Sequence, residues 1–330
     1  MIKLSNQSKW QWWKGLIVFG IVMAFIIALR FLKGYIGDPV SYIIEFGILT
    51  IAIIIFFIKK PKFKEVFPVR KITGRDFGGM MLLWLGANRI GGIGTTFTKW
   101  IGTDPSVNTM KEFEPYFTVS GFVFMFVTAC ILAPFCEEII TRGIITSYFR
   151  NIDSDFAIIA IVGVMFGLMH LDPDRICGTA VLGMIITMLF VTRNNILLPI
   201  LFHFLNNAYA TLAEYFVYGY YKFLMDNFFQ GRMSTQYTVN PSTTSLSLGI
   251  TFVLMVISAF PGPLLIVLGY HVLKFQPTPD ENGNMVIPQR TYTLGWKVKK
   301  SLLVGLLCIV VGIVLGICGL IIRALPFYPY

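Results

Sequence analysis

The sequence predicts an all-α, polytopic membrane protein with about eight or nine transmembrane helices. Of its 330 residues, 55% are hydrophobic and 13% are charged, whereas soluble domains contain about 25% charged residues. Apolar runs long enough to cross a bilayer recur along the chain. These observations exclude a soluble globular domain and favour a protein that lies in a lipid bilayer.

Nine segments are candidates for crossing the membrane, and their boundaries are the ends of the apolar runs. They cover residues 15–32, 40–58, 77–97, 117–149, 155–171, 178–192, 195–213, 246–273 and 301–324. The segment 77–97 is the weakest candidate, because Asn88, Arg89 and four glycines interrupt its apolar pattern. It is expected to be re-entrant or strongly tilted, and a re-entrant segment would leave eight true crossings.

The first candidate span is expected to remain in the protein. Lys3, Lys9 and Lys14 precede its apolar run, as basic residues do in a signal peptide. The run ends at residues 29–33 without the small residues of a cleavage site. The sequence therefore predicts a retained helix.

Basic residues gather in two loops between predicted spans. The first loop carries Lys59, Lys60, Lys62, Lys64, Arg70, Lys71 and Arg75. The second carries Lys274, Arg290, Lys297, Lys299 and Lys300. Because basic loops stay in the cytoplasm, the N-terminus is placed there, and nine genuine crossings would put the C-terminus outside. The net charge of +10 is assigned to topology and to contact with anionic lipids, not to nucleic acid.

Three regions follow from this pattern: N-terminal transmembrane helices over 1–116, a core of helices over 117–213, and further helices over 214–330. The segment 214–245 alternates aromatic with polar side chains, which predicts an interfacial helix and then a polar loop. An aromatic belt and a substrate-entry gate both fit that pattern. No internal repeat is visible, so the inverted-repeat architecture of many transporters gains no support.

Three polar groups interrupt otherwise apolar predicted helices. Each ionisable side chain at membrane depth costs roughly 2.5 kcal/mol or more, so such residues usually serve chemistry or transport. The groups contain two of the three histidines of the chain. They consist of Glu137, Glu138 and Arg142; of Phe166 and His170; and of His203 and Asn207.

Helix geometry predicts how these side chains meet. A rise of about 1.5 Å per residue puts Glu137 and His170 at about the same depth, with His203 within a small shift of it. Residues four apart share a helix face. Glu138 is therefore expected to pair with Arg142, which leaves Glu137 free for proton transfer.

This set of side chains suits hydrolysis of an amide bond. A partly desolvated Glu137 can act as general base towards water, and His170 can orient that water or share its proton. The imidazole of His203 and the carboxamide of Asn207 can donate to the oxyanion of the tetrahedral intermediate. Neither an HExxH motif nor a CxxC pair is present, so no metal, cofactor or disulfide framework is expected.

Other functions remain open at this point. Taken singly, buried Glu–Arg pairs, membrane histidines and membrane asparagines are more often packing elements than catalysts. A non-proteolytic immunity or scaffold protein would use the same residues for structure. A proton-coupled transporter would relay protons through them, with Glu45 and Glu214 as further candidates. A metalloprotease with His170, His203 and a glutamate as ligands is the chemical variant, and sensitivity to chelators would distinguish it.

The three groups resemble the motifs of the CPBP family, the CAAX-protease and bacteriocin-processing proteins also called Abi proteins. That family carries EExxxR, then FxxxH, then HxxxN, on successive core helices. Here the motifs are Glu137-Glu138 with Arg142, Phe166 with His170, and His203 with Asn207, within about 135–207. The chain departs from many members at Thr141, where they carry an aromatic residue.

The resemblance implies an intramembrane glutamic endopeptidase, a hydrolase with a catalytic core of helices near 117–213. By similarity, Glu137 and His170 activate water, His203 and Asn207 form the oxyanion hole, and Glu138 and Arg142 support the site. The expected substrate is a peptide or protein in or at the membrane. The absence of an appended soluble domain is similar to bacterial members, so a bacterial cell membrane is the expected location.

Overall fold

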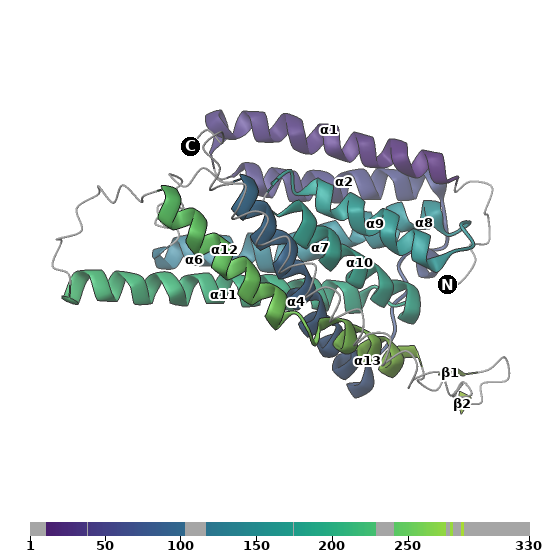
Figure 1. Ribbon diagram of the computed structural model, residues 1–330. Coiled ribbons are helices and arrows are strands. Elements are labelled where there is room, and N and C mark those ends of the chain that lie inside the picture. The colour runs from purple at the N-terminus through teal and green to yellow at the C-terminus, as the bar shows by residue number, and fades with distance from the viewer. Residues whose placement is uncertain are drawn as a thin grey trace, which may run out of the picture.

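The chain is described from a computed structural model that covers residues 11–37, 39–102, 117–173, 175–228, 241–274, 278–279 and 285–286. The predicted span 301–324, residues 229–240 of the polar loop predicted after the aromatic segment, and the basic residues of the second loop beyond Lys274 lie outside these residues. The described part is predominantly helical (Figure 1). Its two short strands, β1 (Thr278–Pro279) and β2 (Met285–Val286), form an antiparallel pair.

The first half of the described chain supplies four separate helices and one long composite helix. The separate ones are α1 (Trp12–Ile36), α2 (Val40–Lys59), α3 (Phe63–Val66) and α4 (Gly74–Gly102). The composite helix consists of α6 (Val119–Met125), η3 (Phe126–Leu132), α7 (Ala133–Glu138), η4 (Ile139–Ile145) and α8 (Thr146–Phe149). In the second half lie α9 (Asp155–Met169), α10 (Ile176–Arg193), α11 (Leu197–Phe228), α12 (Pro241–Ser258) and α13 (Gly262–Lys274).

Five segments of the described chain are long and apolar enough to cross a membrane. They are Trp12–Tyr35, Val40–Lys59, Val119–Phe149, Ile176–Arg193 and Ile250–Lys274, and Asp155–Met169 is a shorter apolar helix. The predicted class, a helical membrane protein, is confirmed. The predicted number of eight or nine crossings is not confirmed.

Three elements differ in detail from the prediction. The segment 77–97 is not re-entrant: it forms part of the unbroken helix α4, which runs obliquely to α1 and α11 in Figure 1. The predicted span 246–273 is divided into α12 and α13, because Pro261 lacks the N–H that a continuous helix needs. The aromatic segment from 214 to 228 is not a separate interfacial helix but the second half of α11.

The composite helix contains two π-helical segments, η3 and η4. Pro134 lies at the start of α7 between them, where its missing N–H removes one helical hydrogen bond. The wider π-helical turns are rare and occur most often at functional sites. Glu137 and Glu138 end α7, directly before the second π-helical segment.

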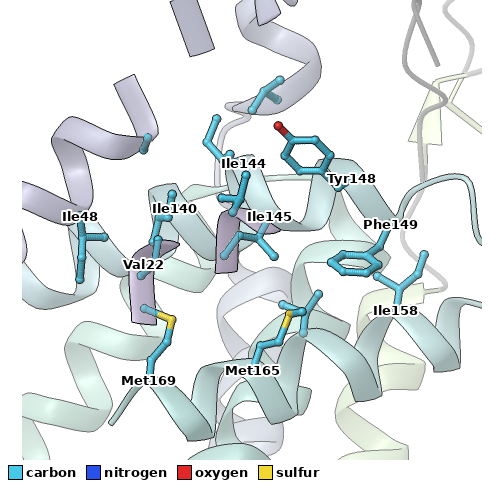
Figure 2. Packing of buried hydrophobic residues seen from close by; sticks show 14 of the residues in the cluster. Val22, Ile48, Ile140, Ile144, Ile145, Tyr148, Phe149, Ile158, Met165 and Met169 are labelled. Atoms are coloured by element: carbon cyan, nitrogen blue, oxygen red, sulfur yellow. The ribbon is translucent and has the colours of Figure 1, made fainter. Parts of the chain in front are cut away.

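Two large apolar clusters, and a small one between α12 and α4, hold the described bundle together. The larger one, shown in Figure 2, joins α1, α2, η4, α8 and α9 through side chains such as Val22, Ile48, Ile144, Phe149 and Met165. The second joins α4, α10, α11 and α13. The composite helix therefore lies between α1–α2 and the remaining helices, which places its polar residues in the interior.

Close packing of α9 on α10 depends on two glycines. A Cβ atom on Gly183 would lie 2.9 Å from the carbonyl oxygen of Gly163, and one on Gly163 would lie 2.6 Å from the backbone nitrogen of Met184. Small residues of this kind let two membrane helices approach until their backbones touch. The contact brings the Gly183 carbonyl and Phe166 to the site described next.

Candidate active site

Glu138 lies at the centre of a fully buried ion-pair group. Its Oε1 atom accepts hydrogen bonds from Arg142 Nη1 and from His203 Nδ1, both at 2.9 Å. Glu138 and Arg142 are 0% exposed and His203 is 4% exposed. The helical spacing predicts the pair with Arg142, whereas the contact with His203 joins residues 65 positions apart.

Arg142 makes further contacts that fix its guanidinium group. Nη2 donates to the carbonyl oxygen of Gly183 at 3.0 Å, and Nη1 donates to the hydroxyl of Thr141 at 2.9 Å. The guanidinium carbon lies 4.4 Å from the centre of the Phe166 ring, which is a favourable cation–π distance. Thr141 thus provides the arginine with a hydrogen-bond acceptor at the position where the chain departs from the family pattern.

Phe166 separates the buried ion-pair group from the second histidine. Its ring centre lies 5.4 Å from that of His203 and 5.1 Å from that of His170, and both contacts are edge-to-face. The contact with His170 agrees with the one-turn spacing of these residues. Through this ring, η4, α9 and α11 share one packed centre, which fixes the two imidazoles relative to each other.

A cavity of about 390 Å³ lies on the other side of this centre. Glu137 and His170 both line it, although they come from different helices. The remaining wall is supplied mainly by α1 and α2, and by Met169. Its lining residues are Ile26, Arg30, Lys33, Val40, Ser41, Ile44, Glu45, Ile48 and Met169.

His170 directly follows the last residue of α9. Its Nδ1 atom lies 3.0 Å from the carbonyl oxygen of Phe166. A carbonyl oxygen only accepts hydrogen bonds, so the contact requires a hydrogen on Nδ1 and leaves Nε2 of the neutral ring as an acceptor. Arg30 Nη2 donates to the backbone carbonyl of His170 at 2.6 Å and thereby connects α1 to this residue.

Asp172, close behind His170, forms an ion pair with Arg175 at 3.1 Å. The backbone carbonyl of Asp172 also accepts from the N–H groups of Arg175 and Ile176, where α10 begins. These contacts support a role in the turn between α9 and α10. The position of Asp172 two residues after His170 also fits a hydrogen bond to that histidine, and the ion pair and turn contacts favour the role in the turn.

Glu137 differs from its neighbour in its surroundings. Its Oε2 atom is buried and has no hydrogen-bond partner among the described residues. Glu138 Oε2 is also unpartnered in the described chain, but its Oε1 is held by two cationic or protonatable groups. The two adjacent glutamates therefore face different environments, one inside the protein and the other at a cavity.

Asn207 lies one turn after His203 on α11. Its Nδ2 atom donates to the backbone carbonyl of Ala129 at 2.8 Å, within the π-helical segment η3. The side chain of Asn206 connects it to α4: its Nδ2 lies 3.4 Å from Asn207 Oδ1, and its Oδ1 accepts from Trp84 and Asn88, both at 3.3 Å. The asparagines thus fix the helix positions around the site.

Five of the six predicted site residues are divided between two places, and the sixth, Asn207, lies apart from both. Glu138, Arg142 and His203 are in direct contact, and Glu137 and His170 share the cavity. Asn207 contacts η3. From the sequence, Glu45 was named only as a further candidate for a proton relay and Arg30 was not named, although both line the cavity.

The feature that could have pointed to these two residues is a charged side chain in or beside an apolar run.

The described residues contain no group of three or more His, Cys, Asp or Glu side chains placed to hold a metal ion. The candidate ligands His170 and His203 are separated by the Phe166 ring, which contacts both. His203 Nδ1 already contacts Glu138 Oε1.

A helical membrane protein with a paired and an unpaired glutamate, and with a histidine facing a shared cavity, has the features of an intramembrane hydrolase. A family model described as type II CAAX prenyl endopeptidase Rce1-like matches residues 119–209. The match spans all three motifs and confirms the resemblance of this segment to the CPBP family. It supports a protease of the CAAX type in the membrane. No significant match was found among curated proteins or solved structures.

Proposed function

We propose that the protein is an intramembrane glutamic endopeptidase that cleaves a peptide bond in a membrane-associated peptide or protein. The observation that carries this proposal is the cavity shared by Glu137 and His170. A general base for hydrolysis must lie within reach of a water molecule and must have a free acceptor atom. Glu137 Oε2 and His170 Nε2 are free acceptor atoms within the described structure, and the cavity gives both side chains access to water.

In this mechanism the Glu137 carboxylate removes a proton from water as the oxygen attacks the carbonyl carbon. His170 holds the same water through Nε2, because its Nδ1 is occupied by the Phe166 carbonyl. The apolar side chains that α1 and α2 add to the wall, among them Ile26, Ile44 and Ile48, reduce the number of competing water molecules. The base therefore acts in surroundings of low dielectric constant, where its interactions with a charged intermediate are strong.

The family resemblance assigns the oxyanion hole to His203 and Asn207, which lie beside the buried ion-pair group and not in the wall of the cavity. A carboxylate oxygen only accepts hydrogen bonds, so His203 carries its hydrogen on Nδ1 in the contact with Glu138. His203 then has a further hydrogen to donate from Nε2 only in the form of the ring that carries hydrogens on both nitrogens. Asn207 retains one N–H beyond the one directed at Ala129.

Glu138 and Arg142 are assigned a supporting role. A buried ion pair that loses one partner leaves an unpaired charge in the protein interior, which is strongly destabilising. The pair also orients His203, as a second hydrogen-bonded group commonly does for a catalytic histidine. Catalysis itself requires neither residue to contact the substrate.

The protein is proposed to lie in a bacterial cell membrane with its N-terminus in the cytoplasm. Lys59 ends α2, and the 20 residues of that helix put it about 30 Å from Val40. Arg150 donates to the Glu65 carbonyl and Arg193 pairs with Asp76, each at 2.6 Å. Both arginines therefore share the end that holds the first basic loop, which supports a cytoplasmic position for that end.

The cavity lies towards the opposite end, because the last turns of α1 and the first half of α2 line it. A substrate would then reach Glu137 from the non-cytoplasmic half of the membrane. A membrane-impermeant thiol reagent tests this orientation in a background in which Cys177, Cys308 and Cys318 are replaced by serine. Tyr35→Cys is expected to react in intact cells and Lys62→Cys only after permeabilisation, and the reverse pattern would overturn the orientation.

The function is tested by comparing wild type with Glu137→Gln, which keeps the volume of the side chain but removes the base. Both purified proteins are incubated with prenylated CAAX peptides, leader peptides and membrane-anchored peptides, and cleavage is read by mass spectrometry. Thermal melts check the fold. Glu65→Gln serves as the control, because Glu65 lies in α3 outside the cavity.

Cleavage by wild type and by Glu65→Gln, but not by Glu137→Gln, is the expected result. Equal cleavage by all three proteins would remove Glu137 from the mechanism. If none cleaves any peptide and a cellular phenotype survives Glu137→Gln, the protein is better described as a membrane scaffold or immunity protein. Loss of cleavage on addition of a chelator would indicate the metalloprotease variant.

A further inference from the structure

A third acidic residue lines the same cavity. Glu45 lies on α2, outside the segment 119–209 matched by the family model, and it is 8% exposed. Its neighbours on the cavity wall, Ile44 and Ile48, are apolar. A carboxyl group on an apolar membrane helix is costly and by default indicates a function.

Neither a hydrogen bond nor an ion pair explains this residue. Glu45 Oε2 is buried and unpartnered, as is Glu137 Oε2, within the part of the chain that is described. Arg30 lines the cavity too, but its guanidinium is directed at the His170 carbonyl. Buried polar atoms normally have partners, so two unpartnered carboxyl oxygens at one cavity indicate a place for water or substrate.

The carboxyl groups of Glu45 and Glu137 are close enough to interact electrostatically. Two like charges at one cavity repel each other, and this repulsion is relieved when the pair holds one proton. Two cationic residues, Arg30 and Lys33, line the same cavity, and the Arg30 guanidinium is directed at the His170 carbonyl. A carboxyl pair that holds one proton offers a carboxylate and a carboxylic acid at the same time. These are the two groups that peptide hydrolysis needs at successive steps.

We propose that Glu45 is a further catalytic residue, which donates a proton to the nitrogen of the leaving amine while Glu137 acts as the base. This inference rests on the proposed function. It assigns the acid to α2, which packs directly on α7, so that base and acid reach the scissile bond from two neighbouring helices.

The step balances as follows. The Glu137 carboxylate takes one proton of water, the water oxygen forms a bond to the carbonyl carbon, and the carbonyl electron pair moves to oxygen. When the intermediate collapses, that pair re-forms the C=O bond. The C–N bond breaks, its electrons stay on nitrogen, and nitrogen takes the proton of Glu45. The proton on Glu137 then moves to Glu45, and the products are a carboxylic acid and an amine.

The test uses Glu45→Gln in the full-length protein and two substrates. The first is a peptide that the wild type cleaves, with its bond located by mass spectrometry. The second carries an ester in place of that amide, because an alkoxide leaves with much less need for protonation. Thr50→Val is the control, since Thr50 lies on the same helix, is exposed and does not line the cavity.

Glu45→Gln is expected to lower kcat on the amide by about 10²–10⁴-fold and on the ester by no more than about tenfold, with KM and the melting temperature unchanged. Glu137→Gln is expected to lose both reactions, since both need the base. An equal loss on amide and ester would make Glu45 a structural residue and overturn the proposal. Undiminished amide cleavage by Glu45→Gln would overturn it as well.

Infrared difference spectroscopy tests the shared proton without a substrate. At neutral pH the wild type is expected to show the carbonyl stretching band of a protonated carboxyl group, and Glu45→Gln is expected to lack it. Absence of the band in wild type would overturn the acid role. If wild type cleaves neither substrate the proposed function fails, whereas wild-type cleavage with an unaffected Glu45→Gln overturns only the role of Glu45.

Discussion

Glu137 and Glu138 are neighbours in the chain, yet they belong to different parts of the molecule. Glu138 is completely buried and accepts from Arg142 and His203. Glu137 borders a cavity with His170 and has an unpartnered carboxylate oxygen within the described structure. A rotation of about 100° between adjacent helical residues separates a side chain that holds the fold from one that is available for chemistry.

The largest expected effect follows from exchanging the two glutamates one at a time for glutamine. Glu137→Gln is expected to lower peptide cleavage by at least about 10²–10⁴-fold and to change the free energy of unfolding by less than about 0.5 kcal/mol. Glu138→Gln is expected to destabilise by about 3–5 kcal/mol, because it leaves the Arg142 charge buried and unpaired. Cleavage assays and thermal melts of both variants measure these effects. A Glu137→Gln protein that unfolds easily, together with a Glu138→Gln protein that is stable but inactive, would contradict the assigned roles of the two glutamates.

Arg142→Met tests the same ion-pair group from its other partner. The change leaves the Glu138 carboxylate without its cation in a fully buried position, so a loss of about 3–5 kcal/mol is expected. Arg175→Met is the matched control, since Arg175 also pairs with an acidic residue near it in the chain but has 58% of its side chain exposed. Exposed pairs contribute about 0–1 kcal/mol. Equal shifts of the two melting temperatures would show that burial does not decide the cost.

Gly183→Ala is expected to lower the stability of the protein by a smaller amount, because it disturbs the packing of α9 on α10. The added methyl group would lie 2.9 Å both from the Gly163 carbonyl oxygen and from Phe166 Cβ. Overpacking of this kind costs about 1–3 kcal/mol and would displace the ring that contacts both histidines. Gly20→Ala is the control, because a Cβ atom there meets nothing within 4 Å. A variant of Gly183 that melts with wild type would contradict the close packing of α9 on α10.

The smallest expected effect is at Asp76, far from the cavity. Burial opposes ionisation of its carboxyl group, but hydrogen bonds from Thr73 and the nearby Arg193 guanidinium together lower the pKa of Asp76 below its ordinary value of 3.8. A lowered pKa stabilises the folded state above the unfolded pKa, and this stability is lost as the pH falls through the folded one. Asp76→Asn is expected to cost about 1–2 kcal/mol at pH 7.

The difference between Asp76→Asn and wild type should shrink as the pH falls below about 4. Melts between pH 3 and pH 7 measure it. A difference that stays constant over this range would show that the Asp76 charge does not contribute. Because the residue lies at the end of the bundle, cleavage at pH 7 is expected to change little compared with that of Glu137→Gln.

Local periodicity accounts for what the sequence alone determined. The apolar runs predict the helices, because a membrane requires every backbone group to be bonded within a helix or barrel. The spacing of four residues predicts the contacts of Glu138 with Arg142 and of Phe166 with His170, because residues four apart share a face. The order of the three motifs predicts the family resemblance. All of these depend on residues that are near one another in the chain.

The tertiary structure decided the contacts between distant segments. It directs His203 at Glu138, Asn207 at the Ala129 carbonyl, and Glu45 towards the cavity of Glu137. These contacts depend on how closely helices pack, which the glycines of α9 and α10 control. Spacing along one helix carries no information on a partner that lies on another. The candidate role of Glu137 was therefore proposed from the sequence alone, whereas the position of Glu45 at the same cavity emerged only from the structure.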